Sequence, residues 1–84
     1  MKQKIIDFVK KHSYLNYDGE YNKQLLFATR KYGDVLEEEP SGTDLREAID
    51  AAKQLNKTFG NHIATDVNTV DEWVELTVTI NKYD

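Results

Sequence analysis

The chain has 84 residues, of which 39% are hydrophobic and 31% are charged, and it contains no cysteine. This length accommodates a single domain, residues 1–84, and the composition is that of a folded protein rather than a disordered one. The missing cysteine excludes disulfides, thiolate metal sites and a cysteine nucleophile. The longest fully apolar run, Leu25–Ala28, is too short for a membrane span or a signal peptide, so we expect no membrane association and a cytoplasmic location.

The charges are distributed unevenly along the chain. Residues 1–32 carry seven basic and three acidic side chains, whereas residues 33–84 carry four basic and twelve acidic ones, for a net charge of −4 overall. An uneven charge distribution produces a field that steers charged partners. The alternative explanation is that these charges only keep a small domain soluble.

The first half predicts a helix followed by a β-hairpin. Ile5, Phe8 and Val9 follow helical spacing within 2–12, and basic residues end that segment. Strands are expected over 14–17 and about 21–32, joined by a turn at Asp18-Gly19. The second strand has a competing helical interpretation, because 23–31 is rich in helix formers. We favour the strand because β-prone side chains such as Phe27 and Thr29 lie within it.

A polar connection, 33–42, precedes the clearest element, a helix over 43–59. Its apolar side chains recur at helical spacing and are expected to form the core, Ile49 among them, so that Ile49→Asp should unfold or severely destabilise the domain. The members of this stripe are Leu45, Ala48, Ile49, Ala52, Leu55 and Phe59.

The last third predicts two strands, over 62–67 and 73–82, with a turn over 68–72. In the final strand Val74, Leu76, Val78 and Ile80 alternate with polar residues, and Trp73 falls on the polar side. Such alternation is typical of an antiparallel sheet with one wet face. We therefore expect Trp73 to be partly exposed.

Together these elements predict an α+β fold in the order α-β-β-α-β-β. It is a single two-layer domain in which the amphipathic helix covers one face of an antiparallel sheet. The core of so short a chain is small, and homodimerisation, with Trp73 as a possible contact, would stabilise it.

No residue pattern indicates catalysis. The two histidines, His12 and His62, are separated in sequence and have no metal-ligand spacing, and Asp66-x-Asn68 lacks the later ligands of a calcium loop. Serine-nucleophile and phosphate-binding glycine motifs are missing as well. We expect a protein that is not an enzyme, with no catalytic residues, no metal and no cofactor.

Carboxylates supply the candidate binding site. Held at spacings near those of DNA phosphates, they would mimic DNA and dock on a basic protein surface. A solvated loop is the alternative for the Glu37–Glu39 run. Trp73 is added as an aromatic interface anchor, and nucleic acid is disfavoured as a partner by the net charge. The candidates are Asp34, Glu37, Glu38, Glu39, Asp44, Glu47, Asp50, Asp71, Glu72, Trp73 and Glu75.

The second half of the chain resembles a known group of inhibitors. The segments TDLREAI (43–49) and VELTVTINK (74–82) are similar in pattern to small phage-encoded anti-CRISPR proteins that inhibit the type II effector nuclease. This resemblance covers about forty residues, and it implies a non-enzymatic inhibitor that blocks the site where the nuclease reads duplex DNA.

The resulting hypothesis is a small acidic phage or mobile-element protein that inhibits a host nucleic-acid-processing protein by stoichiometric binding. One alternative is an immunity or antitoxin protein that neutralises a cognate toxin. Another is a small nucleic-acid-binding module that uses the lysine-rich first helix and the aromatic side chains.

Overall fold

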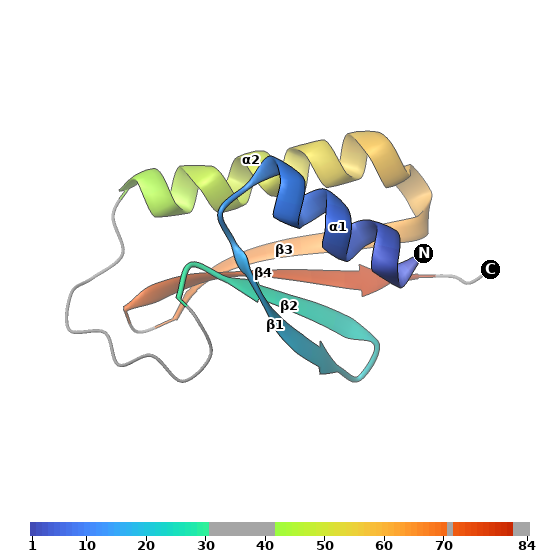
Figure 1. The fold of residues 1–84 in the computed structure, drawn as a ribbon, viewed down its shortest axis with the longest axis horizontal. Helices are drawn as coiled ribbons and strands as arrows, with labels where there is room; N and C mark the ends of the chain where they lie inside the picture. The colour runs from blue at the N-terminus through green and yellow to red at the C-terminus, as the bar shows by residue number, and fades with distance from the viewer. Residues whose placement is uncertain (31–41, 71, 82–84) are drawn as a thin grey trace.

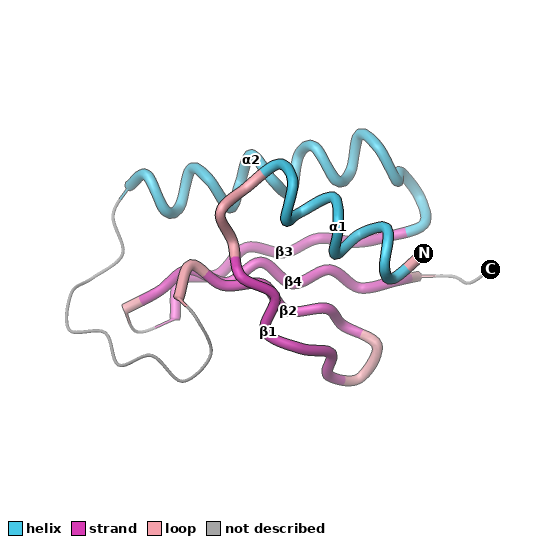
Figure 2. Tube along the Cα trace, in the orientation of Figure 1, coloured by secondary structure: helices cyan, strands magenta, loops and turns pink. Residues whose placement is uncertain are grey.

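The computed structural model describes residues 1–30, 42–70 and 72–81. In these ranges the chain forms the following elements: α1 (Lys2–His12), β1 (Asn16–Tyr21), β2 (Gln24–Ala28), α2 (Gly42–Phe59), the 3-10 turn η1 (Gly60–His62), β3 (Ile63–Val70) and β4 (Trp73–Ile80). The strands form one antiparallel sheet in the order β1-β2-β4-β3. Both helices lie on the same face of this sheet (Figures 1 and 2). The α+β fold and its order of elements are thus confirmed.

The core lies between the sheet and the two helices. Leu25 and Phe27 of β2 point into it, as do Val74, Leu76 and Val78 of β4, and all five are essentially inaccessible to solvent. The alternation along the last strand therefore identified its buried face correctly. The second helix contributes mainly small side chains to this core, whereas α1 contributes the larger Ile5 and Val9.

The hairpin is present, but its turn is not where the sequence predicted it. The turn is at Asn22-Lys23, which both have positive φ angles, 51° and 68°. Asparagine tolerates this conformation well, and a turn of this kind matches the twist of the flanking strands. Asp18-Gly19 lies inside β1 instead, where the pairing with β2 shifts between Tyr17 and Gly19. Gly19, with φ +112°, thus forms a β-bulge rather than a turn.

The second helix is rotated relative to the predicted stripe. Ala48, Ala51 and Ala52 are buried together with Leu55, whereas Leu45 and Ile49 are 40% and 38% exposed. The expectation that Ile49 lies in the core is therefore wrong. Alanines allow the helix to lie close on the sheet, so the buried arc is centred on them and the larger side chains project at its side.

The last hairpin is longer than expected, because β3 continues to Val70, which pairs with Trp73. Residues 68–70, predicted as part of a turn, are therefore strand, and His62 belongs to η1. Most of the predicted polar connection, 33–41, lies outside the described residues, and Gly42 already belongs to α2.

Candidate functional site

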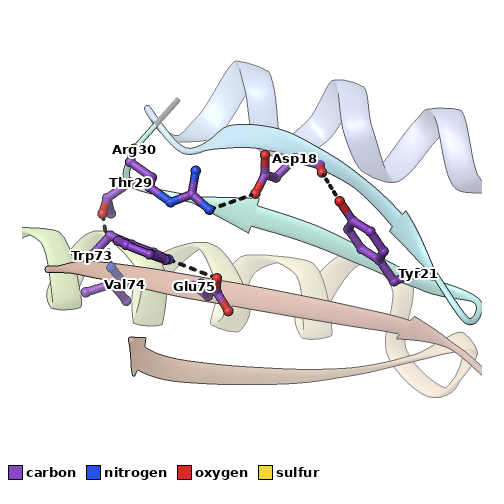
Figure 3. A network of polar contacts seen from close by, with 7 residues as sticks. All are labelled: Asp18, Tyr21, Thr29, Arg30, Trp73, Val74 and Glu75. Atoms are coloured by element: carbon purple, nitrogen blue, oxygen red, sulfur yellow. Dashed lines mark hydrogen bonds and ion pairs between the residues drawn. The ribbon is translucent and has the colours of Figure 1, made fainter. Parts of the chain in front are cut away.

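A network of polar contacts occupies the sheet face that the helices leave open (Figure 3). Trp73 and Glu75 project from this face of β4, and the Trp73 indole Nε1 donates a hydrogen bond to Glu75 Oε2 at 2.9 Å. The Arg30 guanidinium carbon lies 4.1 Å from the centre of the Trp73 ring system. This cation–π contact fixes the indole between a guanidinium group and a carboxylate.

Arg30 is held in turn by Asp18, at the β1 bulge. Arg30 Nη2 lies 3.4 Å from Asp18 Oδ2, and the Asp18 side chain is only 3% exposed. Burying a carboxylate is costly unless an opposite charge compensates it, so the contact with Arg30 offsets the cost of burying Asp18. The other oxygen, Asp18 Oδ1, is buried and has no hydrogen-bond partner among the described residues.

Neighbouring residues hold the backbone on both sides of the ion pair, next to Arg30 and at Asp18. Thr29 extends the pairing of β2 with β4, because its N–H donates to the Val74 carbonyl and its Oγ1 accepts from the Val74 N–H. These two contacts anchor the residue next to Arg30 beside the start of β4. On the other side, the Tyr21 hydroxyl donates to the Asp18 carbonyl at 3.2 Å and closes the bulge. The network therefore joins β1, the two residues that follow β2, and β4.

The predicted site residues that the structure describes fall into two groups. Glu72, Trp73 and Glu75 lie at the start of β4, and Trp73 is half-buried, on the wet face as predicted. Asp44, Glu47 and Asp50 lie on α2, in the other layer of the fold. The beginnings of α2 and β4 are at the same end of the molecule (Figure 1). Asp34, Glu37, Glu38, Glu39 and Asp71 lie outside the described residues.

Two of the α2 carboxylates also have a structural role. The Tyr14 hydroxyl donates to Asp44 Oδ1 at 2.5 Å, and the Tyr14 N–H donates to Glu47 Oε1 at 3.2 Å. Partial burial of the phenol and its hydrogen bond to Asp44 raise the pKa of Tyr14 to about 12. These contacts fasten the connection between α1 and β1 to α2. Asp50 is exposed.

Sequence reasoning missed Asp18 and Arg30. The Asp-Gly pair is a common hairpin signal and predicts a turn at Asp18, whereas the bulge that buries this side chain depends on pairing with β2. Arg30 comes next to Trp73 only because β2 and β4 are neighbours in the sheet. The local sequence carries no signal for either contact.

The remaining surface features are modest. A hollow of about 240 Å³ lies between α1 and the first hairpin, with an apolar lining that Lys10 and Asn16 border. Within residues 1–30, 42–70 and 72–81, no three His, Asp or Glu side chains gather as metal ligands would. None of the described helices is long and apolar enough to cross a membrane.

Comparison of the chain with protein-family models, with curated proteins and with solved structures gave no match.

Proposed function

We propose that this protein is a non-catalytic inhibitor that binds a basic surface of a nucleic-acid-processing protein through the Trp73 end of its open sheet face. The observation that carries this proposal is the mounting of Trp73 between Arg30 and Glu75, on the sheet face opposite the two described helices (Figure 1). Tryptophan is enriched among the residues that dominate binding energy at interfaces. A side chain whose rotamer is already fixed loses less entropy on binding.

The charges around Trp73 support a basic partner. Asp18 offsets the charge of Arg30, so Glu72 and Glu75 leave this end of the face with an excess of negative charge. Carboxylates at the rim of an interface mainly accelerate association with a positively charged surface. The net charge of −4 acts in the same direction and disfavours direct binding to phosphates.

The resemblance to anti-CRISPR proteins makes a type II effector nuclease the first partner to test. Purified protein would be titrated into a DNA-cleavage reaction, and we expect cleavage to fall linearly until one equivalent has been added. A matched reaction in which the nuclease is loaded with DNA first should be inhibited much less, because DNA would occupy the same surface. Full cleavage at excess protein in both reactions would reject this nuclease as the partner.

Variants of the open face test the site against the partner so identified. Replacing Trp73 with alanine removes the anchor, and we expect affinity to fall about thirtyfold, the equivalent of about 2 kcal/mol. Circular dichroism would first establish that the variant is folded. An unchanged affinity would contradict the placement of the site at Trp73.

The electrostatic part of the proposal needs a pair of matched variants. Glu75→Gln and Asp50→Asn each remove one negative charge, but Glu75 is on the open face and Asp50 is exposed on α2. The association rate, measured by surface plasmon resonance at low and physiological salt, should fall for Glu75→Gln and lose part of its salt dependence. A larger effect from Asp50→Asn would assign the interface to α2 instead.

A further inference from the structure

Within the described part of the chain, the free edge of β3 has neither a bulge, a proline nor a basic side chain to block pairing, and Asp66 is the one charged residue of the strand. Among the described residues β3 pairs on one side only, with β4, and its eight residues are in continuous register without a bulge. The strand contains no proline, lysine or arginine, which are the residues that usually block pairing at an edge. Such an edge is a template for another strand.

The backbone groups available at this edge follow from the pairing. The Asn81 N–H donates to the His62 carbonyl at 2.9 Å, so these two residues form a hydrogen-bonded pair. Hydrogen-bonded and non-hydrogen-bonded pairs alternate in an antiparallel ladder. Thr65, Val67 and Thr69 therefore direct their N–H and C=O groups away from β4.

A second observation comes from α2, above the same edge. The Asn56 side chain donates to Thr65 Oγ1 of β3 at 2.9 Å, which shows that this flank of the helix faces β3. Ile49 and Leu45 precede Asn56 by seven and eleven residues, so at 3.6 residues per turn they lie on the same flank. They are the two large aliphatic side chains of α2 that remain exposed. The opposite flank contacts Tyr14 through Glu47.

We propose that this protein forms a homodimer in which β3 pairs with β3 of a second copy, antiparallel about a two-fold axis at Val67. In this register Thr65 lies opposite Thr69 of the second copy, and each of these pairs exchanges backbone hydrogen bonds. Asp66 lies opposite Asn68 of the second copy. Within one chain the Asn68 amide donates to Asp66 Oδ2 at 2.8 Å, and the second N–H of this amide would face the carboxylate of the other copy. A register centred on Asp66 would instead place two carboxylates against each other, which is unfavourable.

The helices fit this arrangement as well. The second helix packs over β3 and β4, and neighbouring strands are about 4.8 Å apart, so the two copies of α2 would run side by side at about 10 Å. That is the normal spacing of packed helices, and it buries Leu45 and Ile49 between them. The two four-stranded sheets would become one sheet, with both Trp73 sites on its open face. A second copy would thus supply hydrogen-bond partners for the outward N–H and C=O groups of β3 and would also bury the exposed side chains of Leu45 and Ile49.

The mass in solution, measured by light scattering over a range of concentrations, is the first test. We expect twice the mass of the chain at high concentration and dissociation on dilution. Val67→Pro removes an outward N–H without breaking the ladder to β4, as prolines at sheet edges do, and should weaken the dimer at least tenfold. A single-chain mass at every concentration would overturn the proposal, as would a dimer that this variant does not affect.

A helix variant keeps the test valid if the proline variant does not fold. Ile49→Lys places a charge between the two helices and should also weaken the dimer at least tenfold. Gln54→Lys adds the same side chain on the opposite flank of α2, where Gln54 is exposed, and should leave the dimer intact. Equal effects of the two substitutions would contradict the proposed helix contact.

Cross-linking tests the register, because the chain has no cysteine of its own. The Cα atoms of Val67 in the two copies would be about 5.5 Å apart, within the range of a disulfide, so Val67→Cys should form a covalent dimer on oxidation. In the same register the two Ala64 residues would be about 20 Å apart, and Ala64→Cys should not cross-link. The reverse result would reject the axis at Val67.

Discussion

The two edges of the sheet are built in different ways. At β1 the bulge at Asp18-Gly19 interrupts the regular pairing with β2. The Asp18–Arg30 ion pair and the Tyr21 hydroxyl hold the bulge in place, and Lys2 of α1 contacts Glu20 at 2.7 Å. At β3 the strand is regular, and its outward backbone groups have no strand beside them within the described part of the chain. Proteins that disrupt one edge while leaving the other regular restrict further pairing to the regular edge. The difference therefore points to stability at β1 and to association at β3.

Removal of the carboxylate at the β1 bulge should have the largest effect on stability. Asp18→Ala removes the buried carboxylate that contacts the Arg30 guanidinium, and we expect a loss of about 3 kcal/mol in the free energy of unfolding. Urea denaturation followed by circular dichroism would measure it.

The control is Glu20→Ala, which breaks the exposed contact with Lys2 on the same strand. That contact raises the pKa of Lys2 through the hydrogen bond to Glu20 and the opposite charge, but exposed pairs add little to stability. A similar loss in both variants would show that burial does not distinguish the two pairs.

Glycine at the bulge is the next test. Gly19 has a φ of +112°, which side chains rarely adopt, so Gly19→Ala should cost about 1–2 kcal/mol through backbone strain. The added Cβ would lie 3.4 Å from the Tyr21 hydroxyl oxygen, an ordinary contact. Gly42→Ala, at the start of α2, meets no neighbour and should stabilise slightly. Thermal melts of both variants would separate strain from crowding, and equal melting temperatures would refute the strain.

Tyr14→Phe tests the contact that fastens β1 to α2. Loss of the hydrogen bond to Asp44 should cost about 1 kcal/mol at neutral pH. The pKa of Tyr14 is raised from 10.0 to about 12, so the folded state holds the phenol proton more tightly than the unfolded state. Stabilisation is therefore complete below pH 10 and is lost as the pH rises towards 12.

The stability difference between the wild type and Tyr14→Phe should shrink over the same pH interval. Ultraviolet titration should show a tyrosine ionisation step at about pH 12 in the wild type, and this step should be missing in the variant. A tyrosine titration that is the same in both proteins would contradict the hydrogen bond.

The smallest effect on stability is expected at Ile49, on the flank of α2 that lies above β3. Ile49→Asp would unfold the protein if Ile49 lay in the core, as the helical stripe predicted. Because Ile49 is 38% exposed, we expect a change within about 0.5 kcal/mol when the protein is dilute enough to be monomeric. A melting scan at low concentration would measure it, and a collapse of the melting temperature would return Ile49 to the core.

Most elements of the fold could be predicted from sequence because their signals are local. Helical spacing identified α1 and α2, and strict alternation identified β4 with its buried Val74, Leu76 and Val78. These signals arise from the periods of helix and strand, and a single segment expresses them fully. The acidic candidate residues could also be identified from the sequence. The contacts of Asp44 and Glu47 with Tyr14 could not, because they form only in the folded chain.

Tertiary structure decided which of two compatible local choices each segment adopts. Asp18-Gly19 and Asn22-Lys23 can both form a turn, and pairing of β1 with β2 selects the second and buries Asp18 at a bulge. Within α2, both the Leu45–Ile49 side and the alanine side could face the sheet, and close packing on β3 and β4 selects the alanines. Arg30 reaches Trp73 for the same reason, because strand order places β2 beside β4. Each of these outcomes depends on residues distant in sequence, whose contacts exist only once the chain has folded.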